Sequence, residues 1–261
     1  MEKKYTFDEL IQIIEKLRSK DGCPWDREQT HKSLKNCMIE EAYEVVEAID
    51  IYDKSKDYQN LCEELGDVLL QVVLHSQIGK EEGSFQIEDV ITGICEKMIR
   101  RHPHVFQNTQ VQTTEDVLKN WEDIKKEEKK EENVSQAMLS VPKALPANIR
   151  AEKIQKKAAK VGFDFINYEE ALEKVYEELN ELEMARKLGL KAHINEEFGD
   201  LMFSVVNLSR FLKLNAENSL TNATNKFINR FVDVENLAVA KKVHLDELSV
   251  DELNALWAEV K

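Results

Sequence analysis

Acidic residues interrupt the apolar face of a predicted helix at the motif E-E-x-x-E. Glu41 falls between Met38 and Val45 on that face, and Glu44 lies close to it. Most Glu-rich helices expose their acids to solvent, and a solvated face is the alternative interpretation here. Carboxylates at core positions, however, lose hydration and repel one another unless a cation lies between them. The position of Glu41 therefore favours a metal site.

The next predicted helix carries a related motif, E-E-x-x-D. Glu64 and Asp67 lie three residues apart, on a helix that is mostly apolar over residues 68–78. The same four acidic positions recur later in the chain as Glu178, Glu181, Glu197 and Asp200. Carboxylate oxygens favour hard cations, so we expect Mg²⁺, with Mn²⁺ as the alternative. A di-iron centre is disfavoured because it uses Glu-x-x-His on two helices, and neither acidic helix carries that pattern.

Basic and aromatic residues follow the acidic helices in both halves of the chain. They are Lys97, Arg100, Arg101, Trp121 and Lys125 in the first half, and Lys226, Arg230 and Trp257 in the second. Guanidinium groups match the geometry of phosphate oxygens, and lysine supplies a mobile positive charge. Tryptophan packs in cores more often than it binds ligands, but its ring can also stack on a nucleobase. The combination indicates phosphate binding beside a metal.

The motifs occur twice in the same order, which indicates a duplicated domain. Matching segments are separated by 129 to 137 residues. Between them, two prolines, Pro142 and Pro146, interrupt helical structure because proline lacks an amide donor. We predict an amino-terminal domain at residues 1–130, a linker at 131–147 and a carboxyl-terminal domain at 148–261.

Periodicity and composition predict an all-α fold. Apolar residues recur at helical spacing in most segments, and Thr6 with Glu9 predicts a capping box at the first helix. The 261 residues include only 8 glycines and 4 prolines, too few for the many turns of an all-β protein. Each half should form a bundle of about four main helices. We expect residues 61–78, and the corresponding helix of the second half, to be buried on several sides.

Charge and cysteine content exclude several classes of protein. The formal net charge of −14 disfavours direct nucleic-acid binding, because the phosphate backbone attracts lysine and arginine. The sequence contains no stretch of about 18 apolar residues, so no membrane span is expected. The amino terminus lacks the apolar run of a secretory signal, and the 4 cysteines show no C-x-x-C spacing. We therefore expect a cytoplasmic protein with reduced thiols.

In these motifs the sequence resembles the MazG-type nucleoside triphosphate pyrophosphohydrolases, in their two-domain form. The resemblance covers almost the whole chain and includes the segments GCPWDREQTHKSL, residues 22–34, and KIQKKAAKVGFDF, residues 153–165. It implies two tandem helical bundles of the all-α NTP pyrophosphohydrolase type, assembled as a homodimer. The implied reaction is Mg²⁺-dependent hydrolysis of nucleoside triphosphates to monophosphate and pyrophosphate. Water would attack the α-phosphorus, with broad NTP and dNTP specificity and a housekeeping role in the nucleotide pool.

The resemblance also implies roles for individual residues. The metal-binding and catalytic carboxylates are Glu41, Glu44, Glu64 and Asp67 in the first domain and Glu178, Glu181, Glu197 and Asp200 in the second. The nucleotide-binding residues are Lys174, Glu177, Glu196, Lys226, Arg230 and Trp257 in the second domain and Lys97, Arg100, Arg101, Trp121 and Lys125 in the first. Cys37 stands where the second copy has Lys174, and Asn229 stands where the first copy has Arg100. We therefore expect unequal sites, with an active second domain.

Other functions remain as alternatives to this interpretation. A non-catalytic nucleotide sensor or partner-binding scaffold would use the acidic residues to hold a ligand without turning it over. Hydrolases restricted to dUTP and dCTP, and those acting on phosphoribosyl-ATP, share the fold but resemble single-domain relatives. The duplicated chain disfavours both of these.

Overall fold

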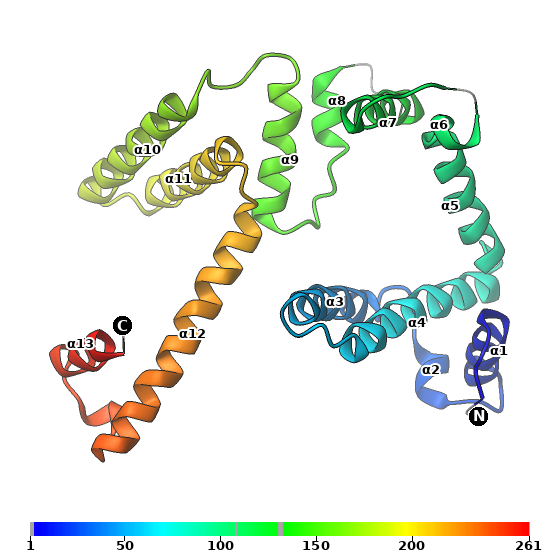
Figure 1. The fold of residues 1–261 in the computed structure, drawn as a ribbon, viewed down its shortest axis with the longest axis horizontal. Helices are drawn as coiled ribbons and strands as arrows, with labels where there is room; N and C mark the ends of the chain where they lie inside the picture. The colour runs from blue at the N-terminus through cyan, green and yellow to red at the C-terminus, as the bar shows by residue number, and fades with distance from the viewer. Residues whose placement is uncertain (1–2, 108, 130–132, 261) are drawn as a thin grey trace. The chain divides into compact units, whose positions relative to one another are not determined.

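The chain folds into helices grouped in two compact units (Figure 1). The computed structural model describes residues 3–107, 109–129 and 133–260, and that part of the chain contains no strand. Contacts divide the chain into units Met1–Glu128 and Lys129–Lys261, and each unit contains one copy of the acidic motifs. The all-α fold class is confirmed. Residues 1–2 and 130 of the predicted first domain, 131–132 of the predicted linker and 261 of the second domain lie outside the described residues.

The first unit is organised around a hairpin of two long helices. Its helices in chain order are α1 (Phe7–Arg18), α2 (Pro24–Glu28), α3 (Lys35–Ser55), α4 (Gln59–Glu82), α5 (Ile87–Arg101), α6 (Pro103–Phe106) and α7 (Thr114–Lys129). Helix α3 packs on α4, and α1 packs on α2 and α4. The buried core joins α1, the segment before α3 and the second half of α4 through Ile14, Leu34, Val73, Leu74 and Ile78. This core fixes the hairpin that carries the first acidic motifs.

The second unit repeats the hairpin with different surroundings. Its elements are α8 (Val134–Leu139), α9 (Ala147–Ala159), α10 (Tyr168–Leu188), α11 (Lys191–Phe211), α12 (Ala216–Lys241), the 3₁₀ helix η1 (Leu245–Glu247) and α13 (Val250–Glu259). Helix α10 packs on α11, and α9 contacts α8, α11 and α12. Helix α13 packs on α12 over a core of Val234, Ala238 and Leu256.

Local sequence signals account for several helix ends. The Thr6 hydroxyl accepts a hydrogen bond from the Glu9 amide, and the Glu9 carboxylate accepts one from the Thr6 amide at 2.9 Å, so the predicted capping box is confirmed. Asn167 caps α10 in a similar way by accepting from the Glu170 amide. Gly189 ends that helix in the left-handed region, at φ 72°, which a glycine adopts without strain.

Two expectations differ from the structure. The stretch 131–147, predicted as a linker, contains helix α8, which Asn133 caps and which packs on α9. Burial of α4 and α11 on several sides is wrong for the single chain. Val73 and Ile78 are buried, but Leu65 is 52% exposed on α4 and Phe198 is 55% exposed on α11. Within the described part of its own unit, each of these exposed side chains therefore lacks a helix that covers it fully. No described helix is both long enough and apolar enough to cross a membrane.

Candidate active sites

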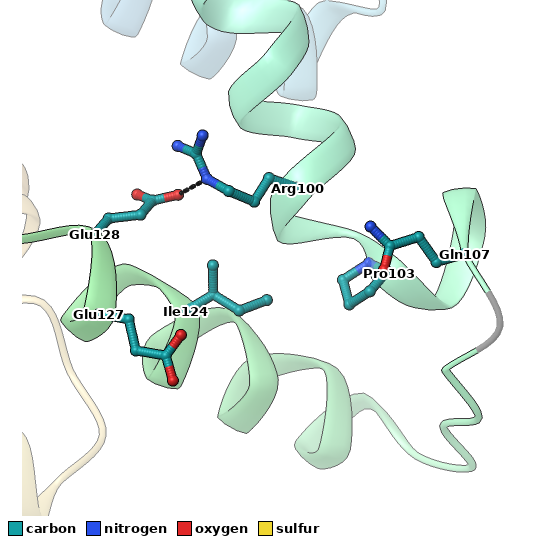
Figure 2. Close-up of a pocket in the computed structure, with 6 residues that line it drawn as sticks. All are labelled: Arg100, Pro103, Gln107, Ile124, Glu127 and Glu128. Atoms are coloured by element: carbon teal, nitrogen blue, oxygen red, sulfur yellow. Dashed lines mark hydrogen bonds and ion pairs between the residues drawn. The ribbon is translucent and has the colours of Figure 1, made fainter.

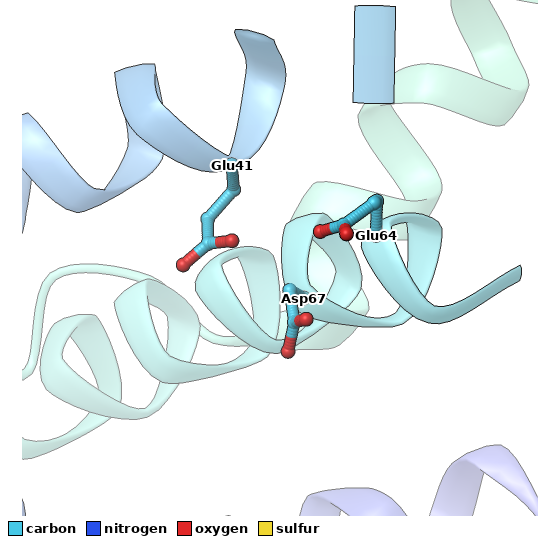
Figure 3. A group of neighbouring side chains, drawn as sticks. All are labelled: Glu41, Glu64 and Asp67. Atoms are coloured by element: carbon cyan, nitrogen blue, oxygen red, sulfur yellow. The ribbon is translucent and has the colours of Figure 1, made fainter. Parts of the chain in front are cut away.

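Three carboxylates from α3 and α4 meet in the first unit (Figure 3). Glu41 on α3 faces Glu64 and Asp67 on α4, and one oxygen of each lies within 4.8 Å of the others. All three side chains are half-buried. Asn60, one turn before Glu64, donates a hydrogen bond of 2.7 Å to Glu64 Oε1. The two helices therefore bring together three of the four carboxylates predicted for this domain.

The fourth predicted carboxylate, Glu44, lies beside this group on an exposed position of α3. Partial loss of hydration, followed by the negative charges of Glu41 and Glu64, raises the pKa of the Glu44 carboxyl group. The contributions of Glu41 and Glu64 to this shift reflect the negative charge gathered at this point of the hairpin. A bound divalent cation would relieve that crowding.

The second unit brings together a similar group from α10 and α11. Glu178, Glu181 and Glu197 each offer an oxygen within 4.8 Å of the other two. Glu178 is only 6% exposed, and Glu181 has its pKa raised by partial loss of hydration and by the charges of Glu178 and Glu197. Asp200 is exposed and lies outside this group. Each of the four acidic motif positions is therefore represented in at least one of the two groups.

A lysine lies directly against the second group. Lys174 Nζ lies 2.8 Å from a carboxylate oxygen of Glu177 and 2.8 Å from one of Glu178. These contacts, Glu177 first, raise the pKa of the Lys174 amine above its usual range. Glu196, on α11, is exposed. Lys174 is thus the predicted nucleotide-binding cation that the structure places at the carboxylates.

Two arginines of the first unit, Arg100 and Arg101, contact a carboxylate of α7, and Figure 2 shows the contact of Arg100. Arg100 Nε donates to Glu128 at 2.7 Å, and Arg101 Nη2 donates to the same carboxylate at 2.5 Å. The Arg101 guanidinium also lies 5.2 Å from the centre of the Trp121 ring. These hydrogen bonds lower the pKa of Glu128 from 4.5 to about 2. Arg100 and Glu128 line an open pocket together with Pro103, Gln107, Ile124 and Glu127.

The corresponding arginine of the second unit has different partners. Arg230 Nη2 donates to the backbone carbonyl of Trp257 at 2.5 Å, and its guanidinium lies 4.0 Å from the centre of that ring. Phe227 packs against the same ring, with 5.1 Å between ring centres. Arg230 is therefore held by an aromatic residue and a carbonyl group rather than by a carboxylate.

The structure separates two sets of residues that were expected to share a site. Lys97 and Lys226 are exposed, on α5 and α12, and Lys125 lies on α7 one turn after Trp121. Within the described part of each unit, no hydrogen bond or ion pair joins the basic residues of α5 or α12 to the hairpin carboxylates. Sequence reasoning also missed Asn60 and Glu128. Asn60 could have been found from its spacing of four residues before Glu64, whereas Glu128 is one acid among many in a charged run.

Both carboxylate groups fit a hard divalent cation. All donors are carboxylate oxygens, they come from two adjacent helices, and their mutual repulsion falls when a cation lies between them. The set contains no histidine or cysteine ligand, which zinc and iron sites favour. Mg²⁺ suits this donor set, and Mn²⁺ has the same preference for oxygen.

Comparison with known proteins identifies the family. The model of the MazG nucleotide pyrophosphohydrolase domain matches residues 29–106 and 167–234, which contain the two acidic hairpins. A Thermotoga maritima protein named nucleoside triphosphate pyrophosphohydrolase/pyrophosphatase MazG is 48% identical over 255 residues, covering 98% of this chain and 95% of that protein. An Escherichia coli K12 protein named nucleoside triphosphate pyrophosphohydrolase is 40% identical over 257 residues, covering 97% and 96%. The uncharacterized protein YabN of Bacillus subtilis is 50% identical over 260 residues, covering 98% of this chain but 52% of YabN. The chain belongs to the MazG nucleotide pyrophosphohydrolase family.

Proposed function

We propose that this enzyme hydrolyses nucleoside triphosphates to nucleoside monophosphate and pyrophosphate, in a reaction that depends on Mg²⁺. The observation that carries the proposal is the meeting of three carboxylates within 4.8 Å in each unit. Two relatives that match nearly the whole chain are named for nucleoside triphosphate pyrophosphohydrolysis, which supports the same activity here.

The carboxylates of the two hairpins would hold the cation. Glu41, Glu64 and Asp67 would do so in the first unit, and Glu178, Glu181 and Glu197 in the second, with Glu44 and Asp200 completing the sets. Bound Mg²⁺, or Mn²⁺ in its place, would neutralise charge on the triphosphate oxygens.

The other polar and aromatic residues would position the nucleotide. Lys174, beside Glu178, is placed to bind a triphosphate oxygen, and the remaining basic residues would contribute when α5 or α12 approaches the hairpin. A water molecule would attack the α-phosphorus, so that the bond from this phosphorus to the bridging oxygen breaks and pyrophosphate leaves. Stacking on Trp121 or Trp257 tolerates any base, which supports broad specificity and a role in maintaining the nucleotide pool.

A product-resolved assay tests this function. The purified chain is mixed with each common ribonucleoside and deoxyribonucleoside triphosphate and Mg²⁺, and the products are separated by anion exchange. We expect monophosphate and pyrophosphate in equal amounts, and none after chelation of the metal. Diphosphate with orthophosphate would contradict attack at the α-phosphorus. Nucleotide binding without turnover would instead support the sensor or scaffold.

We also propose that the chain forms a homodimer. The acidic hairpins expose large apolar side chains, including Val46 and Ile49 on α3 and Phe198 on α11, and α12 exposes Phe227. Monomeric soluble proteins rarely expose large apolar patches, and a second copy of this chain would cover these side chains. Sedimentation equilibrium should give twice the mass of the 30.3 kDa chain. A mass that stays at the single-chain value over micromolar concentrations would contradict the dimer.

A further inference from the structure

Each acidic hairpin has one end that is closed by a short connection and one end that is not. Residues 56–58 join α3 to α4, and residues 189–190 join α10 to α11. The carboxylates lie well away from the opposite end. Glu178, for example, lies ten residues after the start of α10, or about 15 Å along the helix. Any change in the separation of the helices at that open end would alter the distance between the carboxylates.

An ion pair with a largely buried arginine closes the open end of the second hairpin. Arg210, in the last turn of α11, forms a bidentate pair with Asp164, which precedes α10. Nη2 lies 2.7 Å from Oδ2 and Nη1 lies 3.2 Å from Oδ1. The side chain of Arg210 is 11% exposed and that of Asp164 is 23% exposed. Arg210 also donates to Asn207 on its own helix. The pair therefore joins the segment before α10 to the end of α11.

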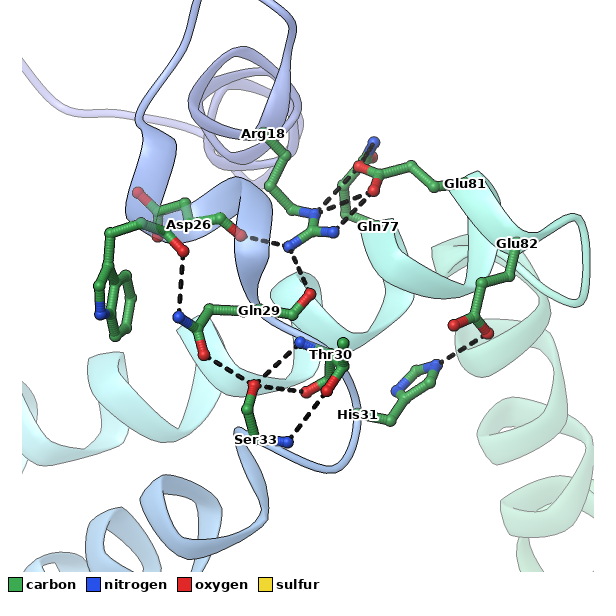
Figure 4. A network of polar contacts seen from close by, with 10 residues as sticks. Arg18, Asp26, Gln29, Thr30, His31, Ser33, Gln77, Glu81 and Glu82 are labelled. Atoms are coloured by element: carbon green, nitrogen blue, oxygen red, sulfur yellow. Dashed lines mark hydrogen bonds and ion pairs between the residues drawn. The ribbon is translucent and has the colours of Figure 1, made fainter.

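A second ion pair closes the open end of the first hairpin (Figure 4). Arg18 lies in the last turn of α1, and its side chain is 4% exposed. Its Nη2 donates a hydrogen bond of 2.7 Å to the Glu81 carboxylate near the end of α4. Its Nη1 donates to the backbone carbonyls of Asp26 and Gln29, in the segment that leads into α3. The same segment contacts α4 again through His31, whose Nδ1 lies 2.8 Å from Nδ1 of His75. Arg18 thus joins α1, the segment before α3 and the end of α4.

The two copies use different residues for the same purpose. In the first copy the carboxylate is on the second helix of the hairpin and the arginine lies outside it. In the second copy the arginine is on the second helix, and the carboxylate is in the preceding segment. By the alignment of Glu64 with Glu197, Arg210 corresponds to Gln77 rather than to Glu81. In both copies an ion pair with a largely buried arginine lies at the open end, although it is built from non-equivalent residues, which indicates that closing the open end is what the site requires.

We infer that Arg210–Asp164 and Arg18–Glu81 are positioning pairs, which hold the carboxylates of each hairpin at the separation that a divalent cation needs. The inference rests on the proposed metal-dependent function. It also accounts for the segments 22–34 and 153–165, which flank the hairpins and contain no carboxylate of the metal groups. None of these four residues is proposed to touch metal or nucleotide.

Manganese binding by the full chain tests the inference for the second hairpin. Glu41→Gln serves as the parent, so that the second group is the intact one, and free Mn²⁺ is measured by electron paramagnetic resonance without nucleotide. Adding Arg210→Gln should weaken Mn²⁺ binding by about tenfold or more, the usual effect of removing a group that orients a metal ligand. Excess Mn²⁺ should restore turnover, which a merely unfolded protein would not show. Lys187→Gln, which breaks an exposed ion pair on the same α10, is the matched control and should bind Mn²⁺ like the parent.

The outcomes separate this inference from the function on which it rests. Absence of both Mn²⁺ binding and turnover in the wild-type chain would overturn the proposed function. The positioning role would be overturned by a different result. In that case the parent binds Mn²⁺, and the Arg210→Gln variant is folded by circular dichroism and binds Mn²⁺ with an affinity within twofold of the parent's. If Arg210→Gln does not fold, Asp164→Asn and Arg210→Lys replace it, and Mn²⁺ affinity within twofold of the parent's would again overturn the positioning role. Arg210→Lys is informative because lysine keeps the charge but loses the bidentate geometry.

Discussion

At the scale of single residues, the two copies differ most in how their arginines are held. Arg100 and Arg101 both donate to Glu128, so a phosphate group would have to displace that carboxylate to reach them. Arg230 instead donates to a backbone carbonyl and lies over the ring of Trp257, and its charge is not neutralised by an acid in these contacts. This difference supports unequal activity of the two sites.

The Glu128 contacts predict a pH-dependent contribution to stability. Arginine holds the pKa of Glu128 at about 2 in the folded state, against an ordinary value of 4.5. A lowered pKa stabilises the folded state above pH 4.5, and this stabilisation is lost as the pH falls from 4.5 towards 2. Glu128→Gln should therefore melt at a lower temperature than the wild type at pH 7, with a difference that shrinks between pH 4.5 and pH 3.

Thermal denaturation followed by circular dichroism at pH 7, 5, 4 and 3 checks this dependence. Glu127→Gln is the control, because its carboxylate is the exposed neighbour that lines the same pocket. A melting difference for Glu128→Gln that is as large at pH 3 as at pH 7 would show that the ion pair does not act through its charge.

At the scale of elements, the sequence predicts those features that depend on residues close together along the chain. The capping box of Thr6 and Glu9, the helical stripes and the alignment of Glu41 with the apolar face all involve residues within one or two turns. Arg18 and Glu81, in contrast, are 63 positions apart, and Asp164 and Arg210 are 46 apart. Such pairs leave no periodic signal, because their partners meet only after the helices pack.

The carboxylate groups could be predicted only in part for a related reason. The motif spacing places acids on facing helices, but the crossing of the helices decides which of them approach. Glu44 falls just outside the first group, and Asp200 outside the second. Helix α8 was missed because the prolines after it suggested a linker, while the Asn133 cap that begins it is a weaker signal.

The loop after α4 lies so close to this helix that, at one glycine of α4, we predict that an added side chain would clash with the loop. A Cβ at Gly79 would lie 2.7 Å from a ring carbon of Phe85 and 2.8 Å from its carbonyl oxygen. Gly79→Ala should therefore destabilise the chain by about 1–3 kcal/mol, the usual cost of overpacking. Gly93→Ala on α5, where nothing lies within 4 Å, should instead stabilise by up to about 1 kcal/mol. Urea denaturation measures the change in the free energy of unfolding for each variant. Changes of the same sign and size in the two variants would contradict the clash at Gly79.

At the scale of the whole molecule, duplication gives the chain two acidic hairpins in different surroundings. The first hairpin packs on α1 and is joined to the segment before it by Arg18. The second packs on α9, where Gln155 donates to the carbonyl of Phe203 at 2.8 Å. Both expose apolar side chains, which the proposed homodimer would cover. A duplicated chain that keeps both acidic sets, but differs in the cations around them, is suited to one dominant and one weaker site.

Single and double substitutions test this division of activity. Glu178→Gln removes the buried carboxylate that pairs with Lys174, so pyrophosphate release should fall by about tenfold or more. Glu41→Gln should lower the rate by less than about twofold, because Cys37 stands where the second site has Lys174 and the nearby arginines are bound to Glu128. The double variant should lose the remaining turnover. Glu183→Gln on α10 and Glu47→Gln on α3 are exposed controls and should match the wild type. If Glu41→Gln causes the larger loss, the first hairpin is the dominant site, and neutralisation of its arginines by Glu128 does not limit catalysis.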